Sequence, residues 1–97
     1  MERLSKILDA IDAEADERER RWEQKHGSTD VLAVLYLQLK PTALARGRLT
    51  MKRALEIEHI AAYPFCHSDA ELEQLLAELL QLEAMEAVDR ALRFIAP

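Results

Sequence analysis

The last third of the chain shows the clearest pattern of apolar and polar positions. Residues 68–96 contain no Gly and no Pro and are rich in Leu, Ala and Glu, which are strong helix formers. Ser68 followed by Glu71 matches a capping box, in which each side chain accepts a hydrogen bond from the other residue's backbone N–H at the start of a helix. The pattern therefore predicts one long C-terminal helix over residues 68–96.

The apolar face of this predicted helix changes sides near its middle. At ~100° per residue, the leucines of the first half share one face: Leu72, Leu75, Leu76, Leu79 and Leu82. Beyond Glu83 the apolar positions fall on the opposite face: Met85, Val88, Leu92 and Ile95. A helix that covers one core keeps a single apolar stripe. Either the helix breaks near Glu83, or a continuous helix contacts two different bodies.

We expect the continuous helix, because residues 81–87 contain nothing that removes a backbone hydrogen bond or loosens the chain. Such a helix is ~43 Å long, whereas a compact chain of this size has a radius of gyration of only ~13 Å. Its apolar end should extend beyond the core, and an exposed apolar surface usually marks an interface. Because homodimers dominate soluble oligomers, we predict a homodimer with these contact residues: Leu80, Met85, Val88, Leu92 and Ile95, with Trp22 as a second contact.

The first part of the chain predicts a helix over residues 2–25. Apolar side chains recur there at spacings of three and four, from Leu4 to Ile11, as one face of a helix requires. Residues 12–25 are mostly charged, so we expect this half to project or to lean on a partner through Trp22. The alternative is that Trp22 covers the edge of the core. Gly27 suits the left-handed position that ends many helices.

The middle of the chain predicts two further helices. Residues 30–46 read as a buried helix with a kink at Pro41, because proline lacks the N–H that the helix ladder uses. A short apolar run is also compatible with a strand, but the chain offers no second strand to pair with it. Thr50 is a suitable N-cap for a helix over residues 50–62. We therefore predict an all-α domain over residues 1–97, a small bundle of four to five helices.

Size and composition narrow the class of protein. Ninety-seven residues make one domain, and the longest apolar run, residues 31–37, is too short to span a bilayer. Acids occur throughout the first 17 residues, which is unlike a signal peptide. The single cysteine excludes an internal disulfide framework. These features predict a cytoplasmic protein without a membrane role.

Charge is distributed unevenly along this acidic chain. The net charge is −5, yet residues 40–53 contain five bases and no acid. This basic segment could bind an anion or an acidic partner at the start of the third helix, and its bases are Lys40, Arg46, Arg48, Lys52 and Arg53. The alternative is that it contacts the acidic C-terminal helix.

A loose helix-turn-helix pattern around Ala43 and Gly47 gives an alternative function, a DNA-binding regulator that uses residues 40–53. Glu56 and Glu58 on the second helix would repel phosphate, so nucleic acid is the less favoured partner. We instead predict that Glu58 pairs with Arg46 or Arg48.

Reactive side chains are few. Cys66 precedes the last helix, a place where a thiol pKa can fall, but no base is positioned by the sequence to activate it. His59, His67, Cys66 and Glu56 lack the paired spacing of structural zinc sites. We therefore predict no catalytic residue, no metal and no cofactor. The sequence favours a non-enzymatic protein–protein interaction or regulatory module that acts as a homodimer.

Overall fold

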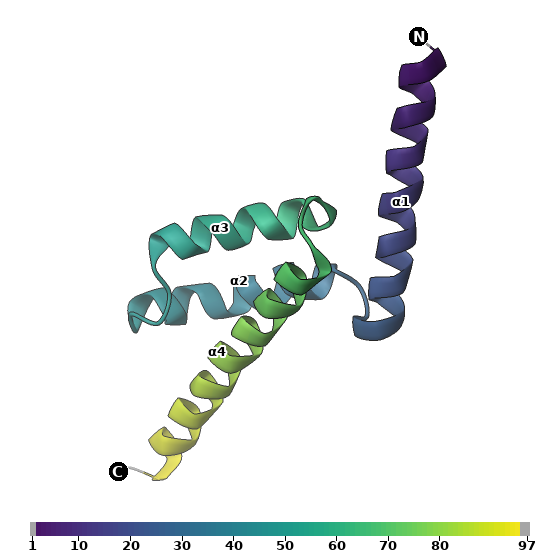
Figure 1. The fold of residues 1–97 in the computed structure, drawn as a ribbon. Helices are drawn as coiled ribbons and strands as arrows, with labels where there is room; N and C mark the ends of the chain where they lie inside the picture. The colour runs from purple at the N-terminus through teal and green to yellow at the C-terminus, as the bar shows by residue number, and fades with distance from the viewer. Residues whose placement is uncertain (1, 96–97) are drawn as a thin grey trace.

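The computed structural model describes residues 2–95 and confirms the all-α prediction (Figure 1). Four α-helices follow one another, with a single 3-10 turn, η1 (Pro64–Cys66), between the last two. Their bounds are α1 Glu2–His26, α2 Asp30–Ala45, α3 Met51–Ala62 and α4 Asp69–Ile95. Helix α4 runs unbroken past Glu83; its predicted last residue, Ala96, lies outside the described residues.

The core lies where α4 crosses α2 and α3, which run side by side (Figure 1). The first half of α4 supplies the centre, since Leu72, Leu75 and Leu79 are 0% exposed. Burial of each such leucine contributes about 1.5–3 kcal/mol. The other buried side chains are Trp22, Leu32, Leu35, Tyr36, Leu39, Ala43, Leu49, Ala54, Ile57, Ile60 and Leu82.

Local signals in the sequence start and end the helices. Gly27 and Gly47 have φ values of 84° and 68°, a left-handed conformation that glycine adopts without steric cost. The Thr50 hydroxyl accepts a hydrogen bond from the Arg53 N–H at 3.1 Å. The Ser68 hydroxyl accepts one from the Glu71 N–H at 3.1 Å, and the Glu71 carboxylate accepts one from the Ser68 N–H at 3.4 Å. The predicted capping box is therefore formed.

Removal of the Ser68 hydroxyl is expected to destabilise the fold. Ser68→Ala leaves the Glu71 N–H without its side-chain acceptor, and such a loss costs about 1 kcal/mol. The measurement is urea unfolding at one fixed protein concentration. Ser5→Ala is the matched control, because Ser5 is exposed inside α1. Equal stabilities for the two variants would contradict a capping role.

Helix α2 differs from its prediction in its burial. Only one face is buried, and Val31, Val34 and Leu37 on the other face are 49%, 53% and 65% exposed. The reason is that α4 covers the α2–α3 pair from one side only (Figure 1). The helix runs through Pro41 to Ala45, within the predicted range. The carbonyl that loses its N–H partner belongs to Leu37, whose exposed position lets water replace that partner.

Helix α1 is oriented opposite to our expectation. The charged half docks on the body and the apolar half projects into solvent (Figure 1). Only residues 27–29 join α1 to α2, so the end near Trp22 must lie beside the core. The Arg18 guanidinium holds it there by donating hydrogen bonds to the Phe65 carbonyl at 2.9 Å and to the His67 carbonyl.

The projecting helices give the molecule an elongated shape. Its extents are 69 × 28 × 18 Å and its radius of gyration is 17.4 Å, whereas a compact chain of this length has about 12.5 Å. Within residues 2–95, no helix combines the length and the apolar character needed to cross a membrane.

Candidate protein–protein interface

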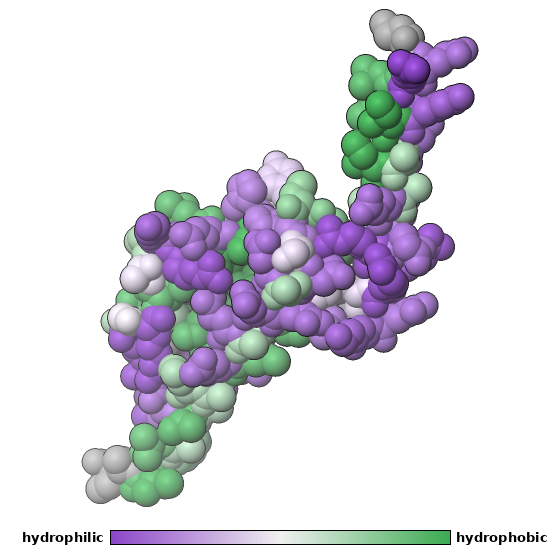
Figure 2. All heavy atoms as spheres, in the orientation of Figure 1, coloured by the Kyte–Doolittle hydropathy of each residue, from purple (hydrophilic) through white to green (hydrophobic). Residues whose placement is uncertain are grey.

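The second half of α4 carries an apolar surface that its own chain leaves uncovered. We call it the α4 face, and its side chains are exposed by 37–77%: Leu80, Met85, Val88, Leu92 and Ile95. They are the α4 residues that the sequence pattern assigned to an interface. The neighbouring Phe94 is 95% exposed and was not assigned. Figure 2 shows the apolar end of α4 below the body of the molecule. The change of side along α4 thus leaves one stripe in the core and the other in solvent.

A shallow depression of about 340 Å³ lies beside this face. Its lining residues are Arg48, Gln81, Ala84, Met85, Val88 and Asp89. Apolar side chains dominate the accessible part, and one charged pair lies at the edge. Such a surface can accept apolar side chains from another helix.

The charged edge of the depression is an ion-pair cluster. Arg46 and Arg48 each place a guanidinium nitrogen near the same Asp89 carboxylate oxygen, at 3.3 and 2.7 Å. Arg48 holds the pKa of Asp89 below its usual range. These pairs fasten the turn after α2 to the second half of α4. They favour the alternative in which the basic segment contacts the acidic C-terminal helix.

The remaining bases of the segment also pair within the chain, with one exception. Lys40 lies 3.2 Å from the Glu58 carboxylate, so the predicted pairing of Glu58 with Arg46 or Arg48 is wrong. Glu58 also accepts a hydrogen bond from the buried Tyr36 hydroxyl, and burial together with this bond raises the pKa of Tyr36.

Arg53 and Lys52, the last two bases of the segment, differ from each other. The Arg53 guanidinium contacts Glu78 at 3.1 Å and Glu56 at 3.0 Å. Lys52 makes no ion pair with residues 2–95.

Helices α2 and α3 lie side by side (Figure 1), whereas the two helices of a helix-turn-helix motif cross at a steep angle. This geometry and the neutralised bases give little support to DNA binding through residues 40–53.

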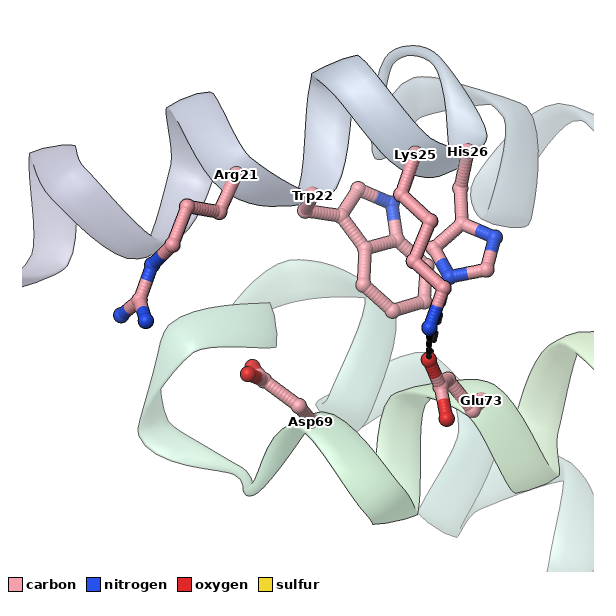
Figure 3. Close-up of a pocket in the computed structure, with 6 residues that line it drawn as sticks. All are labelled: Arg21, Trp22, Lys25, His26, Asp69 and Glu73. Atoms are coloured by element: carbon pink, nitrogen blue, oxygen red, sulfur yellow. Dashed lines mark hydrogen bonds and ion pairs between the residues drawn. The ribbon is translucent and has the colours of Figure 1, made fainter.

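Trp22, the predicted second contact, lies in the core. Its indole is 5% exposed and projects from α1 towards α4 (Figure 3). Its ring centroid lies 4.2 Å from that of His26. Lys25 and His26 approach the same Glu73 oxygen at 2.8 and 3.2 Å. Trp22 therefore closes the edge of the core, which was the alternative interpretation, and a partner cannot reach most of its surface.

The histidines and the cysteine do not form a recognisable site. The rings of His59 and His67 are 5.6 Å apart between centroids, and His67 Nδ1 lies 3.0 Å from a Glu71 carboxylate oxygen. Cys66 is exposed, and Glu56 is engaged by Arg53. Within residues 2–95, no group of three or more His, Cys, Asp or Glu side chains is placed to hold a metal ion.

Because of these ion pairs, we expect the stability of the fold to decrease at acid pH. Lys25 lowers the pKa of Glu73 from its ordinary 4.5, and Arg48 lowers that of Asp89 from 3.8. A lowered pKa in the folded state stabilises the protein above the unfolded value, and this contribution is lost as pH falls. We expect the free energy of unfolding to decrease from about pH 5 downwards.

The slope of this decrease should become smaller in the double variant Glu73→Gln and Asp89→Asn. Urea unfolding at a series of pH values measures it. Glu83→Gln is the control, because Glu83 makes no ion pair with residues 2–95. If the free energy of unfolding of the double variant falls as steeply with pH as that of the original chain, the acid sensitivity is due to other groups.

Two further groups of exposed apolar side chains were missed as surfaces. One is the projecting half of α1, where Leu4, Ile7, Leu8 and Ile11 are 52–57% exposed. The other comprises side chains of α2 and α3, among them Leu37 and Leu55. Their helical periodicity was visible, but it could not tell a face on the core from a face in solvent.

Comparison of the chain with models of protein families, with curated proteins and with solved structures found no match.

Proposed function

We propose that this protein is a non-enzymatic interaction module that acts as a homodimer and binds another protein. The observation that carries the proposal is the α4 face. A continuous helix buries Leu72, Leu75 and Leu79 on one side and presents apolar side chains on the other side beyond the core. Large exposed apolar patches are characteristic of interaction sites.

The total surface area supports the same conclusion. The chain exposes 7138 Å², whereas a compact monomer of 11.1 kDa exposes about 5,650 Å². The excess is roughly 1,500 Å². A standard interface removes about 800 Å² from each partner, and permanent homodimers remove more. The uncovered surface is thus large enough for a stable dimer.

The charged side chains support a binding role rather than catalysis. Most of the basic segment is neutralised by carboxylates of the same chain, as Lys40 is by Glu58 and Arg53 is by Glu78. Arg48 and Asp89 at the edge of the depression are paired with each other in the same way. The depression beside the α4 face is mainly apolar, which suits contact with a protein.

The direct test is the mass of the chain in solution, without added residues, by sedimentation equilibrium from nanomolar to high micromolar concentration. The expected mass is twice 11.1 kDa. A monomer throughout this range would overturn the proposal.

A further inference from the structure

The projecting half of α1 is a second uncovered apolar surface, which we call the α1 stripe. It consists of Leu4, Ile7, Leu8 and Ile11, each 52–57% exposed, at spacings that align them along one side of the helix. Figure 2 shows this stripe on the part of α1 that stands clear of the body. Half a helix without tertiary contacts is only marginally stable in water, so an additional contact is needed to hold it.

The chain cannot supply this contact from its own body. Helix α1 is continuous from Glu2 to His26, and its root is fixed to the body by buried Trp22 and by the Arg18 hydrogen bonds. Bringing the stripe back onto the core would require breaking the helix or detaching this root. A second molecule can cover it without either change.

The α1 stripe and the α4 face lie at opposite ends of a molecule 69 Å long (Figures 1 and 2). A second copy turned end for end places its α1 stripe beside the α4 face of the first copy. The same two-fold operation repeats the contact at the other end. One symmetric arrangement thus covers both surfaces on both copies, as an isologous dimer requires.

Charge distinguishes this arrangement from pairing of like ends. Residues 2–17 of α1 contain six acids and two bases, and Asp12 and Glu14 flank the stripe. The end of the molecule that bears the α4 face carries a small positive balance, with Arg46, Arg48, Arg90 and Arg93 against Glu83, Glu86 and Asp89, and Arg48 lines the depression itself.

Two α1 stripes placed together would bring acidic segments into contact, and two α4 faces placed together would leave both α1 stripes uncovered. An α1 stripe on an α4 face instead brings the acidic segment to an end of small positive balance, which avoids the repulsion between like charges.

From these observations we infer that the occupant of the α4 face is the α1 stripe of a second copy, exchanged reciprocally in a two-fold dimer. This inference rests on the proposed homodimer and names the surface that completes it. Leu8 and its neighbours occupy the depression beside Val88 of the other chain, and the carboxylates flanking the stripe face Arg48. Each copy contributes half of each contact.

Cross-linking between two single-cysteine chains tests the arrangement. Cys66→Ser removes the native thiol from both; one chain then carries Leu8→Cys and the other Val88→Cys, with one of them labelled with ¹⁵N. The chains are mixed in urea, refolded and treated with a bismaleimide. The mixed pair is the expected dominant product in the mass spectrum. All substituted positions are exposed within the chain, so the fold is retained, and circular dichroism checks this.

Each other outcome overturns a specific statement. Pairs of Val88→Cys chains alone would mean that α4 faces contact each other, so the homodimer stands and the exchange falls. Pairs of Leu8→Cys chains alone would mean that the stripes pair. A third chain with Leu37→Cys tests whether the α1 stripe docks on α2 instead. If Leu8→Cys cross-links preferentially to this chain, the docking site is α2 and not the α4 face. If the sample is dimeric and no cross-link forms, the exchange is overturned and the homodimer stands. If the sample is monomeric and no cross-link forms, both proposals are overturned.

Discussion

Val88→Glu is expected to convert the proposed dimer into a monomer at micromolar concentration. The side chain of Val88 is 58% exposed within its own chain, so the substitution costs the fold little. In the dimer, the new carboxylate would be buried against apolar side chains. Burial of an unpaired charge costs several kcal/mol, which corresponds to an increase in Kd of about 100-fold or more. Sedimentation equilibrium of the variant and the original chain measures the difference, and Leu92→Glu should behave in the same way.

Leu37→Glu is the matched control for this experiment. Leu37 is 65% exposed on the outer face of α2, away from the α4 face, and it receives the same substitution. We expect its Kd to remain within a factor of about three. If Leu37→Glu dissociated the dimer and Val88→Glu did not, the interface would have to be reassigned to α2.

Trp22→Ala is expected to be the most destabilising single substitution outside α4. Truncation of a buried aromatic side chain costs about 3–5 kcal/mol, a large part of the 5–15 kcal/mol that stabilises a typical domain. Trp22 is 5% exposed and is the only buried residue of α1 within the described part of the chain. The substitution removes the apolar anchor of the helix and leaves the ion pair between Lys25 and Glu73 as an exposed contact. Exposed pairs of this kind contribute little.

Urea unfolding measures the loss, and Glu23→Ala is the control, because Glu23 is an exposed residue on the same helix. Hydrogen exchange adds a regional measurement. In Trp22→Ala, amides of α1 should lose protection before those of α3. A loss below 1 kcal/mol would mean that α1 is held by its polar contacts, chiefly those of Arg18.

The elements of this fold could be predicted from local sequence because their signals are local. A hydroxyl at Thr50 or Ser68, a glycine at position 47 and a run of leucines determine where helices begin, end and bury a face. The two faces of α4 could be predicted for the same reason, since rotation about the helix axis follows from residue spacing alone.

The arrangement of α1 could not be predicted in this way. Its sequence has an apolar half and a charged half, and burial of the apolar half was the natural expectation. The short connection to α2 overrides this preference, because it fixes which end lies near the core. The hydrogen bonds of Arg18 to carbonyls 47 and 49 residues away leave no trace in spacing or composition.

The candidate site was likewise accessible only in part. Residues of the α4 face could be predicted, since they are the apolar positions left after the core face is assigned. The basic segment was misleading because free and neutralised arginines look alike in a sequence. Only the fold places Asp89 within reach of Arg46 and Arg48.

The two ends of the chain lie at the far ends of the molecule (Figure 1), and each leads directly into one of its apolar stripes. A large hydrophilic fusion carrier at either terminus would therefore shield a stripe. Proteolytic release of that carrier would expose the stripe and lower the solubility of the sample. Expression trials that measure only the solubility of the fused form will therefore overestimate the solubility of the free chain.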